Sequence, residues 1–189
     1  MTKEIQTLPP IEVLSRATPT SPRTGEPPRT AELWVSSILL HLASAASAGA
    51  YAWHWWQAAH PDSYATSARM IAWLEPDPGK WLSLLIEGLL ALALVLAAGA
   101  CSVVGLQTWN GWRLARKVSP LAVLLTGLFA LALNQWALIG VGLAVVGVAL
   151  LWLPGVTRYF VRWDELRSVK ADGYRRPDSI YYGRLPRFR

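Results

Sequence analysis

The sequence is short of charge: only 16% of its residues are Asp, Glu, Lys or Arg, whereas 53% are hydrophobic. A soluble domain of similar size carries about a quarter charged residues. The missing charge is concentrated in two stretches. Between residues 82 and 100 the only ionisable side chain is Glu87, and residues 118–156 contain none. Because a membrane-spanning helix needs about 20 mainly apolar residues, these stretches predict an all-α membrane protein that crosses the bilayer several times.

Cysteine is nearly absent as well. Cys101 is the single one, which excludes an internal disulfide and a metal cluster held by cysteines. The sequence also lacks a nucleotide-binding loop, a nucleophile elbow and an HExxH zinc motif. It therefore predicts no catalytic residues, no bound metal and no cofactor of the chain's own, and it predicts bound lipid.

Hydropathy predicts four transmembrane helices, at residues 33–56, 81–107, 118–134 and 137–153. The apolar run from Val118 to Leu153 is too long for one ordinary span. The sequence NQW at 134–136 is the one polar break in this run and indicates a tight turn, so we expect a helical hairpin there. One long tilted helix is the alternative. Residues 32–154 would then form a single membrane domain.

Three polar segments flank these spans. Residues 1–31 are rich in proline and predict an extended N-terminal arm. The stretch HPDSYATSARMIAWLEPDPGK at 60–80 predicts an amphipathic interfacial helix in the first outer loop, capped by Asp62. Residues 155–189 predict a second amphipathic helix, which extends to Gly173 and is followed by a basic tail.

Positive charge is distributed asymmetrically among these segments. In chain order the five segments outside the spans carry 4, 2, 3, 0 and 9 Lys and Arg residues, which together make the 18 of the chain. Lys and Arg near spans prefer the cytoplasm, so both termini are predicted to be cytoplasmic in an inner (plasma) membrane. The same asymmetry accounts for the net charge of +6 through attraction to anionic lipids, and no nucleic-acid partner is predicted.

Tryptophan is abundant, and the stretch YAWHWWQAAH at 51–60 could be interpreted as a redox or metal site. Its position at the end of the first span favours a different interpretation. Nearly every Trp falls where a predicted span meets water, the depth that an amphipathic ring prefers. The predicted interfacial anchors are Trp34, Trp53, Trp55, Trp56, Trp81, Trp109, Trp112, Trp136 and Trp152.

Small residues at four-residue spacing predict close helix packing in lipid. In the first span Ala43 and Ser47 have this spacing, as do Ala45 and Gly49; Gly140 and Gly147 of the fourth span are further predicted packing residues. The sequence leaves two alternatives open: packing within the chain, and contact with another protein.

Glu87 is a candidate functional residue because a carboxylate within a span is costly unless it has a partner. At its depth we expect Tyr51, Ser47 or Asn134 to contact it, or else a group on another subunit. A hydrogen bond between helices, a partner contact and a proton relay are all compatible with the pattern. His41 is the one histidine predicted to lie within the hydrocarbon. It is expected to bond to a backbone carbonyl or a neighbouring Ser, and a single histidine cannot ligate haem on both faces.

In layout the chain resembles the accessory, non-catalytic subunits of the actinobacterial cytochrome bcc–aa3 respiratory supercomplex, with a loop NGWRLARK before a last span that ends LLWLPGVTRYF. The resemblance implies a role in packing beside other integral membrane subunits such as the oxidase or cytochrome b. The alternatives are an independent or oligomeric transporter or channel that uses Glu87, and a regulator that recruits a soluble partner through residues 173–189.

Overall fold

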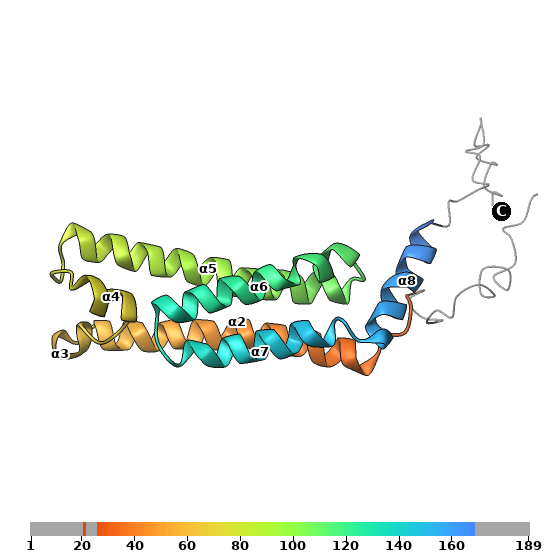
Figure 1. The fold of residues 1–189 in the computed structure, drawn as a ribbon, viewed down its shortest axis with the longest axis horizontal. Coiled ribbons are helices and arrows are strands. Elements are labelled where there is room, and N and C mark those ends of the chain that lie inside the picture. The colour runs from red at the N-terminus through yellow and green to blue at the C-terminus, as the bar shows by residue number, and fades with distance from the viewer. Residues whose placement is uncertain (1–20, 22–25, 169–189) are drawn as a thin grey trace, which may run out of the picture.

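The computed structural model describes residues 21 and 26–168, and within them the secondary structure is helical throughout, without strands. Four helices run side by side as a bundle, and three further helices lie at its ends (Figure 1). The bundle helices are α2 (Ala31–Ala58), α5 (Trp81–Trp109), α6 (Arg113–Ala132) and α7 (Ala137–Leu150); the others are α3 (Pro61–Tyr64), α4 (Arg69–Leu74) and α8 (Pro154–Ser168). The predicted N-terminal arm and basic tail lie almost wholly outside the described residues.

The bundle has the composition of a multi-pass membrane protein. Helices α2, α5 and α6 are each long and apolar enough to cross a bilayer. Helix α7 has 14 residues and passes that test only together with α8, from which it is bent by 64°. The described chain thus contains three candidate spans, or four if the bent pair is one. Since α6 ends at Ala132 and α7 begins at Ala137, the hairpin is confirmed and the single long helix is excluded.

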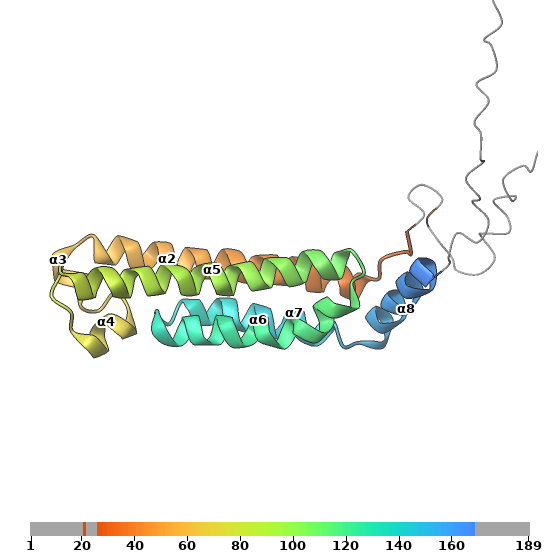
Figure 2. The same ribbon diagram turned by 90° about the horizontal axis from the view of Figure 1, so that it is seen from above.

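Helices α2 and α5 extend past the tip of the α6–α7 hairpin, and α4 lies beyond that tip (Figures 1 and 2). Arg69 at the start of α4 connects α4 to the tip of the hairpin. Its backbone N–H donates to the Leu133 carbonyl oxygen at 2.7 Å, and its Nη1 donates to the Ala130 carbonyl oxygen at 3.2 Å. These carbonyls belong to the C-terminal turn of α6, where a helix leaves its acceptors unsatisfied. The α3–α4 segment therefore covers one end of the bundle.

The prediction of one amphipathic helix in this segment is wrong, because the segment forms two short helices. The break lies at residues 65–68, where the Ser67 hydroxyl donates to the Tyr64 carbonyl oxygen at 2.7 Å. A continuous helix would use the backbone N–H of Arg69 for residue 65, but Leu133 accepts that N–H. Asp62 does not cap the first helix, since the N-cap residue is His60 and no side chain caps it.

Small residues bring α2 and α7 close together. A Cβ atom on Gly140 would lie 2.8 Å from Ser47 Oγ and 3.2 Å from the Ala43 carbonyl oxygen. One on Gly147 would lie 3.1 Å from Leu40 Cγ. Nothing in the described chain lies within 4 Å of a Cβ position on Gly49, so this predicted packing residue does not pack within the chain, and its contact with another protein stays a prediction. Gly49 lies one position off the inward face of α2.

We expect Gly140→Ala to lower stability by about 1–3 kcal/mol, the usual cost of adding a methyl group to a tightly packed core. Gly142→Ala provides the matched control on the same helix, because nothing lies within 4 Å of a Cβ atom there. Thermal unfolding in detergent, followed by circular dichroism, measures both. Equal midpoints for the two variants would contradict the close contact between α2 and α7.

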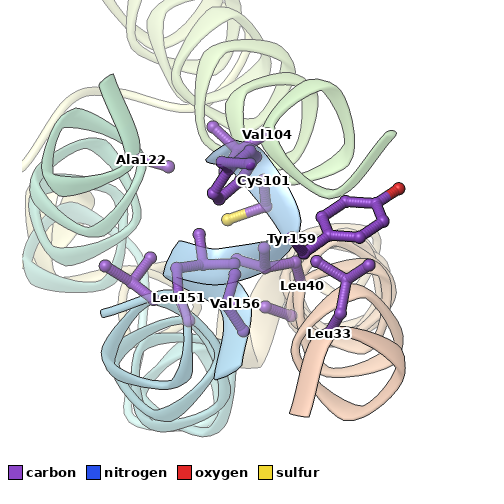
Figure 3. Close-up of a cluster of buried hydrophobic side chains, with 12 residues drawn as sticks. Leu33, Leu40, Cys101, Val104, Ala122, Leu151, Val156 and Tyr159 are labelled. Carbon is purple, nitrogen blue, oxygen red and sulfur yellow. The ribbon is translucent and has the colours of Figure 1, made fainter. Parts of the chain in front are cut away.

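Helix α8 packs against the other end of the bundle. A hydrophobic cluster there contains side chains of α2, α5, α6, α7 and α8, and Figure 3 shows the Cys101 thiol pointing between them. Val156, Tyr159 and Phe160 of α8 are buried in this cluster beside Leu33 of α2. The Tyr159 hydroxyl donates to the Trp109 carbonyl oxygen at 2.7 Å. The amphipathic helix predicted after Pro154 is thus α8, up to the last described residue.

Candidate functional site

A buried histidine and a carboxylate pair between the two longest helices. His54 of α2 lies with its Nε2 2.9 Å from Oε2 of Glu87 on α5. The His54 side chain is fully buried, and that of Glu87 is 19% exposed. The pair lies close to the α3–α4 end of both helices. By helical rise, His54 is about 6 Å from the end of α2 and Glu87 about 9 Å from the start of α5.

The helical repeat of α2 directs His54 inward. Ala43, Ser47, Ala50 and His54 are spaced by four, three and four residues, and all four are buried. Such spacing places side chains on one face of a helix. The neighbouring Trp53, Trp55 and Trp56 are turned outward and are 46–64% exposed. The stretch 51–60 thus combines an outward aromatic surface with one inward histidine.

The second ring nitrogen of His54 is left without a partner. In His41 and His60, Nδ1 bonds to the carbonyl oxygen four residues earlier, at 2.7 and 2.8 Å. The equivalent acceptor for His54 is the Ala50 carbonyl, which accepts instead from Asn134 Nδ2 at 3.2 Å. His54 Nδ1 is buried with no hydrogen-bond partner in the described part of the chain. The same holds for Glu87 Oε1.

Tyr64 of α3 adds a third polar group at this end. Its hydroxyl is buried, with no hydrogen-bond partner among the described residues. Burial raises the pKa of the Tyr64 phenol; the nearby Ser83 hydroxyl lowers it in part, and the Glu87 carboxyl group raises it. The phenol therefore keeps its proton over the physiological pH range.

His54 and Glu87 can share one proton along their hydrogen bond. The pair can exist as imidazolium and carboxylate or as neutral imidazole and carboxylic acid, and either form places complementary groups 2.9 Å apart. This pairing offsets the cost of burying Glu87. Glu87 retains some exposure, so the described chain does not enclose the pair completely.

The other predicted polar contacts lie elsewhere. Glu87 bonds to His54 and not to Tyr51, Ser47 or Asn134, so these three expected contacts are wrong, whereas a contact with another subunit stays a prediction. Asn134 instead connects the hairpin tip to Ala50 of α2 and accepts the backbone N–H groups of residues 136 and 137 at 3.1 and 3.3 Å. His41 is exposed on α2 and bonds to the Ser37 carbonyl, as expected.

The predicted tryptophan anchors are exposed, with the exception of Trp109. Trp109 is half-buried, because the Trp34 ring packs edge-on against it at 4.4 Å and the Arg29 guanidinium lies 4.3 Å above it. Among the described residues, no group of three or more His, Cys, Asp or Glu side chains is placed to hold a metal ion.

Comparison of the chain with protein-family models, with curated proteins and with solved structures gave no match. The function therefore has to be argued from the site and the surface of the bundle themselves.

Proposed function

We propose that this chain is a non-catalytic accessory subunit of a multi-subunit inner-membrane complex, where it contributes to assembly or stability. The complex we favour is a respiratory supercomplex of the cytochrome bcc–aa3 type, in which four helices of this chain span the membrane and both termini are cytoplasmic. The observation that carries the proposal is an outward-facing row of small residues on α2, formed by Ala45, Ala48, Gly49 and Ala52.

This row is separate from the small residues that hold α7. Its four members are exposed, and no atom of the described chain lies within 4 Å of a Cβ position on Gly49. Beside it, a groove of about 420 Å³ runs between α2 and α7. Small residues let a second helix approach closely, which is how helices associate in lipid. Helix α2 therefore offers one small-residue face to its own bundle and another to a partner helix.

The interior of the bundle supports packing rather than transport. Apart from His54, the fully buried polar residues of the described chain are serines and threonines. Ser36, Ser47 and Thr126 each donate to a carbonyl oxygen of the chain itself, at 2.7–2.9 Å. A proton relay needs a series of ionisable groups along the spans. In the described bundle, the His54–Glu87 pair lies at one end and no series of ionisable groups continues from it along the buried interior.

Purification in a mild detergent tests the proposal. We expect the tagged chain to co-purify with oxidase and cytochrome b subunits, identified by mass spectrometry. Replacing Ala45 and Gly49 together with leucine should reduce the recovered partners at least fivefold, because the partner helix loses its close approach. Gly99→Leu is the matched control, because Gly99 is also exposed with open space around it, but on α5.

Recovery of the wild-type chain as a homogeneous species without partners would contradict the proposal. Equal loss of partners in the double variant and in Gly99→Leu would show that α2 is not the contact surface.

The alternative is a small independent or oligomeric transporter or channel, and the observation that favours it is the buried His54–Glu87 pair. In that case Glu87→Ala would abolish proton flux into reconstituted vesicles. An accessory subunit shows no such flux in either form, so the same assay separates the two functions.

A further inference from the structure

At the α8 end, the first turns of α6 and the first turns of α8 enclose a pocket of about 540 Å³, which we call the elbow pocket. It lies where the chain bends by 64° between α7 and α8. Three cations of α6 line it together with aromatic and apolar side chains. The lining residues are Arg113, Leu114, Arg116, Lys117, Trp152, Thr157 and Phe160.

The cations of the elbow pocket are only partly neutralised. Arg113 forms an ion pair with Asp164 of α8, with Nη1 2.8 Å from Oδ2. Within residues 21 and 26–168, neither Arg116 nor Lys117 forms an ion pair. The pocket thus holds two positive charges that have no counter-ion in the described chain.

Arg116 is held in place by neutral groups. Its Nη1 donates to the Thr157 hydroxyl at 2.9 Å, and its guanidinium lies 4.3 Å above the Trp152 ring. Its Nε is buried and has no hydrogen-bond partner in the described chain. These contacts fix the guanidinium at the pocket while leaving its charge uncompensated. A guanidinium presented in this way binds phosphate well, because its planar donors match phosphate oxygens.

The position of these cations on α6 adds to the positive potential. All three lie in the first two turns of the helix, and the first turn contains no acidic residue. The N-terminal end of a helix carries partial positive charge, so cations there are unfavourable and anions are favoured. A bound anion would relieve this unfavourable arrangement.

Exposed apolar residues of α6 lie next to the elbow pocket, as expected around a bound lipid. Leu114 lines it and is 65% exposed, and Val118 and Leu121 continue the same face of α6 away from it, 41% and 53% exposed. Their spacing of four and three residues forms one apolar stripe. An occupant with an anionic head and hydrocarbon chains fits both features. Basic pockets at the ends of membrane helices bind anionic lipid heads.

We propose that the elbow pocket binds the phosphate headgroup of an anionic phospholipid, whose acyl chains lie along Leu114, Val118 and Leu121. Arg116 and Lys117 hold the phosphate, and Trp152 packs beside it. This inference needs the membrane bundle and does not depend on the identity of any partner complex.

Native mass spectrometry of the full-length, delipidated protein tests the proposal, with phosphatidylglycerol and phosphatidylcholine titrated separately. The wild-type protein should prefer phosphatidylglycerol at least tenfold. The double variant Arg116→Gln, Lys117→Gln should reduce this preference to less than threefold. The control Arg158→Gln, Arg162→Gln removes two charges from α8 outside the pocket lining, and it should keep the preference within threefold of wild type.

Lys117→Gln alone removes a charge without breaking a hydrogen bond or ion pair of the described chain, so it keeps the test independent of folding. It should weaken phosphatidylglycerol binding about fivefold, the factor expected for one cation near a membrane surface. Equal losses in the pocket and control double variants, or no headgroup preference in the wild type, would overturn the proposal. Displacement of the lipid by millimolar inorganic phosphate would assign the pocket to free phosphate instead.

Discussion

His54→Ala should lower the thermal unfolding midpoint of the detergent-solubilised protein by about 6–12 °C. The variant leaves the Glu87 carboxylate buried without the group that lies 2.9 Å from it. Breaking a buried pair by removing one partner costs about 3 kcal/mol or more. For a chain of this length, each kcal/mol shifts the midpoint by about 2–4 °C. Circular dichroism during heating measures the shift.

His41→Ala is the matched control for this prediction. His41 lies on the same helix but is exposed, and its Nδ1 bonds only to its own helix. It should change stability by less than about 0.5 kcal/mol, as surface substitutions usually do.

A double-mutant cycle then isolates the pair. His54→Ala combined with Glu87→Ala should cost at least about 1 kcal/mol less than the sum of the two single changes, since each single change already breaks the bond. Glu87→Gln should keep the protein assembled, because an amide can still donate to a neutral His54. Additive single effects would show that the two side chains do not interact.

Gly111→Ala should release α8 from the bundle. Gly111 lies in the turn between α5 and α6 with φ of +70°, and a Cβ there would meet Cδ1 of Trp163 on α8 in a severe clash. The same turn accepts both Arg167 hydrogen bonds, through the carbonyls of Asn110 and Gly111 at 2.7 Å. We expect amide hydrogen exchange across residues 154–168 to accelerate at least tenfold.

Gly79→Ala separates the backbone strain of a side chain at positive φ from the clash with Trp163. Gly79 also has a positive φ, +77°, but no atom lies within 4 Å of its Cβ position. It should therefore cost only the backbone strain of about 1–2 kcal/mol and leave exchange in α8 unchanged. Equal exchange in the Gly79 and Gly111 variants would mean that Trp163 does not hold α8 at this turn.

Three apolar helices and the hairpin could be predicted from the sequence because hydropathy is a local property. Apolar runs around Glu87 and after Val118 mark helices whatever their neighbours are. The split between α3 and α4 could not be predicted, since it depends on the Leu133 carbonyl, which is far away in the sequence, accepting the N–H of Arg69. The docking of α8 depends likewise on the conformation of Gly111.

The His54–Glu87 pair was missed for a different reason. The aromatic residues at 51–60 predict an interface, and hydropathy ends the first span at Trp56, whereas α2 continues to Ala58. A signal for the pair was present in the sequence. The spacing from Ala43 through Ser47 and Ala50 to His54 places the histidine on the inward face, so periodicity would have located it where hydropathy did not.

Cysteine-accessibility mapping in intact and permeabilised membranes tests the central claim most directly. The claim is that the bundle crosses the bilayer four times and that its α8 end lies on the cytoplasmic side. Single cysteines would replace Ser21, Asp62, Asn110 and Ser168 in a Cys101→Ala background. The account predicts that residues 21, 110 and 168 label from the cytoplasmic side and residue 62 from the opposite side. Labelling of residues 21 and 168 from opposite sides would contradict it.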